Sequence, residues 1–141
     1  MYNERINLNV IITDVKSDLV IKKMNLDGKG RGTFKVKTYI NFINKRVPYD
    51  LLFGYYIKTL SGEKQGWKRM IAHAVVPKMG TKRISANHEG EFVIEDMGFM
   101  ESGHYVLECF MCERPDLEDT DEDEFDFDAK GMMISSYFFD V

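Results

Sequence analysis

Hydrophobic and polar residues alternate with a period of two over several parts of this chain. Two segments show the alternation best. Residues 5–15 place Ile6, Leu8, Val10 and Ile12 on one face, and residues 33–43 place Phe34, Val36, Ile40 and Phe42 on one face. The opposite faces carry Asn, Thr and Lys. This pattern is typical of a β-strand with one buried and one wet face.

Further apolar segments recur at short spacing, with turn formers between them. They predict strands over 19–26, 50–60, 67–76, 82–86, 91–97, 103–112 and 131–141. The loop 61–66 should join its flanking strands as a hairpin, and Asn87-His88-Glu89-Gly90 should form a turn. No stretch keeps helical periodicity over three turns. We therefore expect an all-β fold, an antiparallel β-sandwich.

The last two predicted strands also assign their side chains to faces. In 103–112, one face holds Tyr105, Leu107, Cys109 and Met111. In 131–141, Met133, Tyr137, Phe139 and Val141 lie opposite Ile134 and Phe138. Combining the alternating segments predicts one shared core of Ile6, Leu8, Val10, Phe34, Val36, Ile40, Phe42, Tyr105 and Leu107.

Gly103-His104-Tyr105, at the start of an apolar strand, resembles the tyrosine corner of immunoglobulin-like sandwiches. The resemblance implies an immunoglobulin-like architecture in which the Tyr105 hydroxyl bonds to nearby backbone. The sequence departs from that family because Trp67 opens its segment and both cysteines lie together, so no family function carries over. The chain also resembles small β-sandwich proteins of Gram-positive bacteria and their mobile elements, although through no diagnostic motif.

Length and composition fit one globular domain over residues 1–141. The chain of 141 residues is 44% hydrophobic and 13% aromatic, which excludes a generally disordered chain. The first five residues lack the pattern of a signal peptide, and no apolar run is long enough to span a bilayer. We expect a cytoplasmic protein without membrane contact.

Cys109 and Cys112 are the only cysteines. A separation of three residues in a strand points their thiols to opposite faces, which disfavours both a disulfide and a shared zinc ion. We expect two reduced, buried thiols and no metal or other cofactor.

Charge is strongly segregated beneath a net charge of −4. Residues 1–88 hold 17 Lys and Arg against 6 Asp and Glu, a balance of +11, whereas residues 89–141 hold 2 against 17, a balance of −15. The densest acidic segment is 113–128, where Arg114 is the only cation. Such a segment repels itself, so 113–130 should form a long mobile acidic loop before the last strand.

Candidate chemistry is sparse. Asp119, Asp121 and Asp123 have the spacing of a calcium loop, but Glu124 occupies the glycine position and Lys130 the last ligand position. The serines lie in no nucleophile motif, and the glycine-rich stretch 28–32 is no phosphate loop. The sequence therefore favours a non-enzymatic protein.

The basic part of the chain suggests a surface for nucleic acid, on which Trp67 or Tyr39 would stack with bases. The overall acidity argues against that partner. The acidic loop could instead cover the basic surface, within one molecule or between two, which would allow self-association through opposite charges.

We therefore expect a protein-binding module that presents its acidic loop to a partner, with two aromatic residues among the carboxylates as anchors. The alternatives are an acidic inhibitor that imitates nucleic acid on a basic target protein, and a calcium-dependent binding sandwich. A duller alternative has Phe125 and Phe127 beginning the last strand and packing at the edge of the sandwich. The predicted binding residues are Asp119, Asp121, Glu122, Asp123, Glu124, Phe125, Asp126 and Phe127.

Overall fold

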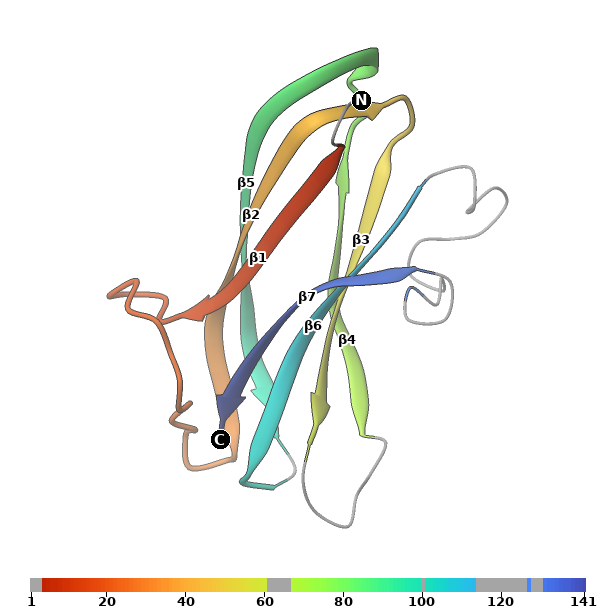
Figure 1. The fold of residues 1–141 in the computed structure, drawn as a ribbon. Coiled ribbons are helices and arrows are strands. Elements are labelled where there is room, and N and C mark those ends of the chain that lie inside the picture. Colours follow the sequence, from red (N-terminus) through yellow and green to blue (C-terminus); the bar gives the residue numbers. More distant parts are fainter. Residues whose placement is uncertain (1–3, 61–66, 100, 114–126, 128–130) are drawn as a thin grey trace.

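The computed structural model describes residues 4–60, 67–99, 101–113, 127 and 131–141, which form seven β-strands (Figure 1). These are β1 (Arg5–Thr13), β2 (Arg31–Val47), β3 (Leu51–Thr59), β4 (Lys68–Val76), β5 (Gly80–Gly98), β6 (His104–Glu113) and β7 (Met132–Asp140). They build two antiparallel sheets with the strand orders β1-β2-β5 and β4-β3-β6-β7. Within the described ranges, no helix is both long and apolar enough to cross a bilayer.

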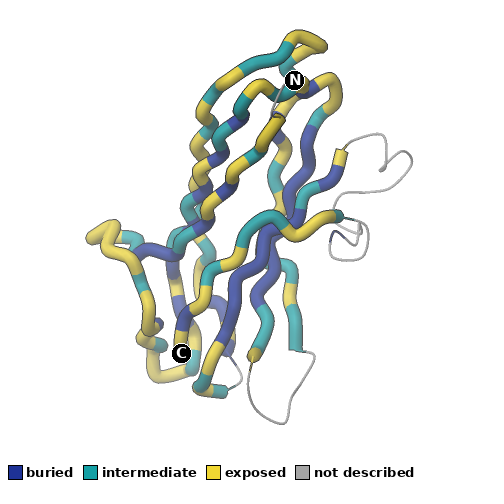
Figure 2. The backbone as a smooth tube through the Cα atoms, viewed as in Figure 1, coloured by how far each residue is buried: buried dark blue, intermediate teal, exposed yellow. Residues whose placement is uncertain are grey.

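The core lies between the two sheets, and every strand contributes at least one buried residue to it. Figure 2 colours the backbone by burial and shows buried positions in both sheets. Eight of the nine predicted core residues are buried in this one cluster, and the ninth, Ile6, packs against it while partly exposed. The predicted faces of β1, β2 and β6 are therefore confirmed. So is the hairpin of β3 and β4, which pairs Leu51 with Val76.

The predicted strand over 19–26 is wrong. Only Val20 and Lys23 form isolated bridges there, to Thr13 and Asp140. The chain leaves β1 in a tight turn, where the Asp14 carboxylate accepts hydrogen bonds from the backbone N–H groups of Lys16 and Ser17. Asp18 follows with φ 60°, a left-handed conformation that interrupts a strand.

The predicted turn at 87–90 is also wrong, because β5 runs through it without interruption. The neighbouring strand β2 offers a continuous ladder, in which Asn41 pairs with Asn87 and Thr38 with Gly90. Pairing with β2 satisfies the backbone of these residues, so the tertiary context overrides their local preference for a turn.

The faces of β7 differ from strict alternation. The register of β6 against β7 shifts between Cys109 and Phe110, so that Met133 pairs with Phe110 and Phe138 with Val106. Both exposed side chains, Met133 and Phe138, therefore lie on the outer face of the sheet, whereas the sequence pattern had placed them on opposite faces. One irregular position in the edge strand β7 reverses the inward and outward orientation of the residues that precede it in that strand.

Replacing Phe34 or Phe42 by Ala should lower the free energy of unfolding by about 3–5 kcal/mol, because both rings are fully buried between the sheets. Chemical denaturation measures the change. Val93→Thr on the exposed outer face is the matched control and should stay within about 0.5 kcal/mol. An unchanged midpoint for either Phe variant would contradict this packing.

Candidate functional site

Of the predicted binding residues, only Phe127 is among those that the structure describes. Asp119, Asp121, Glu122, Asp123, Glu124, Phe125 and Asp126 lie outside the described residues. Phe127 has no exposed surface. It belongs to a second apolar cluster on the outer face of the four-stranded sheet, together with Leu52, Tyr56, Phe110 and Cys112.

Gly54 makes room for the Phe127 ring. A Cβ atom built on Gly54 would lie 2.5 Å from Cγ of Phe127, closer than real Cβ contacts allow. The ring therefore rests directly on the backbone of β3, at the one position of that strand with no side chain. This close approach is a reason for glycine inside a strand, where it is otherwise unfavourable.

Polar contacts also fix Phe127. Its backbone N–H donates a hydrogen bond of 3.1 Å to the Tyr56 hydroxyl, and its carbonyl accepts one of 2.6 Å from the N–H of Gly131. Lys68 lies over the Tyr56 ring, with its Nζ atom 4.7 Å from the ring centroid. Phe127 is thus an internal anchor of the chain, and its ring is not available to a partner. It packs over β3, an inner strand of its sheet, and precedes β7, so it neither begins the last strand nor lies at the edge of the sandwich.

The two cysteines lie on opposite faces, as the spacing predicted. Cys109 is in the main core and Cys112 is in the outer cluster, and both thiols are reduced. Burial raises the pKa of the Cys109 thiol to about 12. Burial likewise raises the pKa of Tyr55, whose hydroxyl shares a 3.0 Å hydrogen bond with the Thr38 hydroxyl across the two sheets. These groups stay protonated at neutral pH, which suits a structural role.

Tyr105 makes the backbone contact that its motif predicted. Its hydroxyl donates a hydrogen bond of 2.6 Å to the carbonyl oxygen of Glu101, four residues earlier. Phe139 stacks on the Tyr105 ring, and Trp67 contacts it edge to face at 5.9 Å. Trp67 is therefore partly buried and packs against the core.

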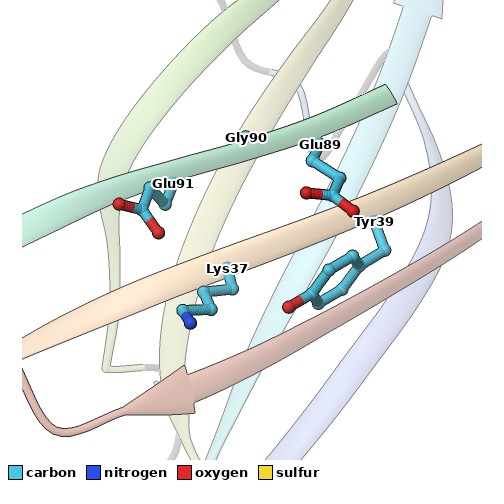
Figure 3. A pocket seen from close by; sticks show the side chains of 5 residues that line it. All are labelled: Lys37, Tyr39, Glu89, Gly90 and Glu91. Carbon is cyan, nitrogen blue, oxygen red and sulfur yellow. The ribbon is translucent and has the colours of Figure 1, made fainter. Parts of the chain in front are cut away.

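The outer face of the three-stranded sheet carries a shallow cavity of about 280 Å³ (Figure 3). Its lining residues come from β2 and β5 and are Lys37, Tyr39, Glu89, Gly90 and Glu91. In Figure 3 the four side chains project from the same side of the two strands. The sequence pattern placed Lys37 on this face, but it could not bring Glu89 and Glu91 beside it, because the predicted turn at 87–90 hid the register of β5.

One carboxylate of a neighbouring loop pairs with two lysines of this face. The Asp18 carboxylate lies 3.0 Å from Nζ of Lys35 and 3.2 Å from Nζ of Lys37. Hydrogen bonds from these two lysines lower the pKa of Asp18, and the bond to Asp18 raises the pKa of Lys37. These two cations belong to the basic part of the chain that suggested a surface for nucleic acid, and both are already engaged within the molecule.

A search of the described ranges finds no group of three or more His, Cys, Asp or Glu side chains arranged to hold a metal ion. The calcium hypothesis concerns Asp119, Asp121 and Asp123, outside those ranges, and therefore stays a prediction.

No protein-family model matches this sequence, and no curated protein is significantly similar to it. Among solved structures, the β-glucosidase of Kluyveromyces marxianus in complex with glucose matches the whole chain with a TM-score of 0.52 and 10% identity. This chain spans 14% of that enzyme's length. At such identity the likeness shows a shared fold and nothing about activity.

Two further solved structures fall below a TM-score of 0.5. The β-glucosidase of Listeria innocua has a TM-score of 0.49 and 14% identity over 98% of this chain and 16% of its own. The alkylpurine DNA glycosylase AlkC of Pseudomonas fluorescens has a TM-score of 0.48 and 14% identity over 99% of this chain and 30% of its own.

Gly54→Ala should destabilise the protein by about 1–3 kcal/mol, because the new methyl group overlaps the Phe127 ring. In a Phe127→Ala background the same substitution should cost much less, since the overlapping ring is absent. Denaturation of the two single variants and the double variant measures this coupling. Gly90→Ala is the control, because a Cβ there meets open space. Additive costs at positions 54 and 127 would contradict the contact.

The Cys109 thiol should resist alkylation in the folded protein and react only on unfolding, because it is fully buried and its pKa is raised. Iodoacetamide labelling followed by mass spectrometry, with and without denaturant, measures this. Elemental analysis of the same samples should find no stoichiometric zinc. Zinc in the purified protein that disappears in a Cys109→Ser, Cys112→Ser variant would contradict the structural role.

Proposed function

We propose that this chain is a non-enzymatic protein-binding module that presents its acidic segment to a partner. The observation that supports the proposal best is the burial of Phe127. The segment 114–126, with eight carboxylates and one Arg, runs between Glu113, the last residue of β6, and this anchored ring. Both ends of the acidic segment are thus attached to the same sheet.

Anchoring both ends favours binding for an entropic reason. A segment tethered at two fixed points samples fewer conformations than a free tail, so ordering it on a partner costs less. The carboxylates also attract a basic partner over distances of up to about 8 Å at physiological ionic strength. The buried anchor and the acidic segment would then have separate tasks, in which Phe127 positions the segment and the carboxylates contact the partner.

We further propose that the sandwich is immunoglobulin-like. Two observations support this. The three-stranded sheet packs on a four-stranded sheet in which β6 is central, and the Tyr105 hydroxyl bonds to the backbone four residues upstream, as in a tyrosine corner. In such sandwiches the loops at the ends of the strands commonly carry the binding residues, which is consistent with a binding segment between β6 and β7.

A variant with 116–126 replaced by a Gly-Ser linker of equal length should fold normally and lose the partner. Affinity capture from the native host with quantitative mass spectrometry compares the two proteins, and circular dichroism checks the fold. Phe125→Ser should weaken capture if that ring is a partner anchor, and Phe127→Ser should weaken it by releasing the segment. An identical set of captured proteins with and without the acidic segment would contradict the proposal.

The salt dependence of the same capture separates the protein-binding module from the inhibitor that imitates nucleic acid. At 1 M salt the Debye length is about 3 Å, so binding that depends on carboxylates alone should disappear. Capture that persists at high salt and is lost in Phe125→Ser favours an aromatic-anchored module. Capture that vanishes with salt and ignores Phe125 favours the imitation of nucleic acid.

A further inference from the structure

The outer face of the three-stranded sheet has an unusual set of polar side chains, which we call the amide face. The register places them in three adjacent rows across β1, β2 and β5. The rows are Asn7, Asn41 and Asn87; Asn9, Tyr39 and Glu89; and Ile11, Lys37 and Glu91. The first two rows therefore collect four amides, one carboxylate and one aromatic ring on a single surface.

Asparagine is depleted in β-strands, so four of them in adjacent positions need a reason. One further strand residue, Asn44, has a backbone reason, because its φ of 48° lies in the left-handed region that asparagine tolerates. The four asparagines of the amide face are absent from the residues with positive φ. Nor does the structure give any of their side chains a hydrogen bond to another described residue. Their donors and acceptors point to solvent or to a ligand.

Tyr39 lies at the centre of this face, between Asn9 on β1 and Glu89 on β5. Its side chain is 37% exposed, and it lines the 280 Å³ cavity with Lys37, Glu89 and Glu91 (Figure 3). An aromatic ring that is fixed in a strand and half open to solvent provides a flat apolar surface, and the groups around it provide hydrogen bonds.

The charged side chains on and around the amide face indicate which kind of ligand, anionic, cationic or neutral, it could bind. Lys35 and Lys37 are paired with Asp18, and Lys35 also lies 4.0 Å from Glu91. Glu89 has no ion-pair partner among the described residues, so two cations face three carboxylates and the local balance is −1. An anionic ligand would be repelled by the excess of carboxylates, and a balance of only −1 gives a polycation little attraction. The balance suits a neutral ligand rich in hydroxyl groups.

We propose that the amide face is a binding site for a neutral saccharide. A sugar ring has an apolar face of C–H groups, which would pack on Tyr39, and a rim of hydroxyl groups. Each sugar hydroxyl can both donate and accept hydrogen bonds. It can therefore donate to the carboxylate of Glu89, and it can donate to or accept from the asparagine amides. Neighbouring strands lie about 4.8 Å apart, so the rows offer polar groups at intervals comparable to a sugar ring.

The test is an NMR titration of the full-length protein with neutral oligosaccharides of glucose, mannose, galactose and N-acetylglucosamine. At least one of them should shift the backbone amide signals of 7–11, 37–41 and 87–91 and leave the four-stranded sheet unchanged. Tyr39→Ala should weaken this binding about tenfold or more, since it removes the stacking surface. Phe138→Ala, which removes an aromatic side chain that is 65% exposed on the other sheet, is the matched control and should bind as the wild type does.

Three outcomes would overturn the inference. The first is no signal shift with any of the four sugars up to about 10 mM, well above a millimolar Kd. The second is binding that maps elsewhere or survives Tyr39→Ala. The third is binding of a sulfated oligosaccharide in preference to the neutral ones. The variant with 116–126 replaced by a Gly-Ser linker should bind sugar normally, so failure of this inference and failure of the protein-binding proposal are distinguishable.

Discussion

The structure depends on one apolar layer, formed where the inner faces of two antiparallel sheets meet. Each strand supplies alternate residues to it, so the period of two in the sequence becomes a division of the molecule into inside and outside. The rings of Phe34, Phe42 and Tyr105 are fully buried in this layer. Because the inner faces are committed to packing, function is left to the outer faces and to the segments that connect the strands. The two outer faces differ. That of the three-stranded sheet is polar, and that of the four-stranded sheet is partly covered by Phe127.

Local patterning was sufficient to predict the all-β class, the strands β1, β2 and β6, the hairpin of β3 and β4, and the opposite orientations of Cys109 and Cys112. These features follow from alternation over five or more residues. Two of the errors have a different cause, since each depends on a partner far away in the chain. Asn87-His88-Glu89-Gly90 forms a strand because β2 lies beside it, and Met133 changes face because of one shift against β6. The strand expected over 19–26 fails for a local reason, the turn at Asp14 and the left-handed conformation of Asp18.

The candidate sites show the same limit. The acidic segment is visible in the sequence as a run of charge, but its anchor depends on a contact between Phe127 and Gly54, 73 positions apart in the chain. The amide face is less visible still, because its rows join residues from three strands that are separated by loops and by the rest of the fold. Because the sequence predicted a turn at 87–90, which is part of β5, the contribution of that strand was missed. The amide face could therefore not be predicted from the sequence.

The hydrogen bond between Thr38 and Tyr55 has a consequence for how the sheets are aligned. Apolar packing is tolerant of sliding, since one aliphatic neighbour replaces another at little cost, whereas a hydroxyl pair is satisfied in only one alignment. If one sheet were displaced by one residue, both hydroxyl groups would be buried in the apolar layer without this hydrogen bond. This hydrogen bond therefore favours a single alignment of the two sheets over other compact arrangements. It also keeps the outer surfaces of the two sheets in a constant orientation relative to each other.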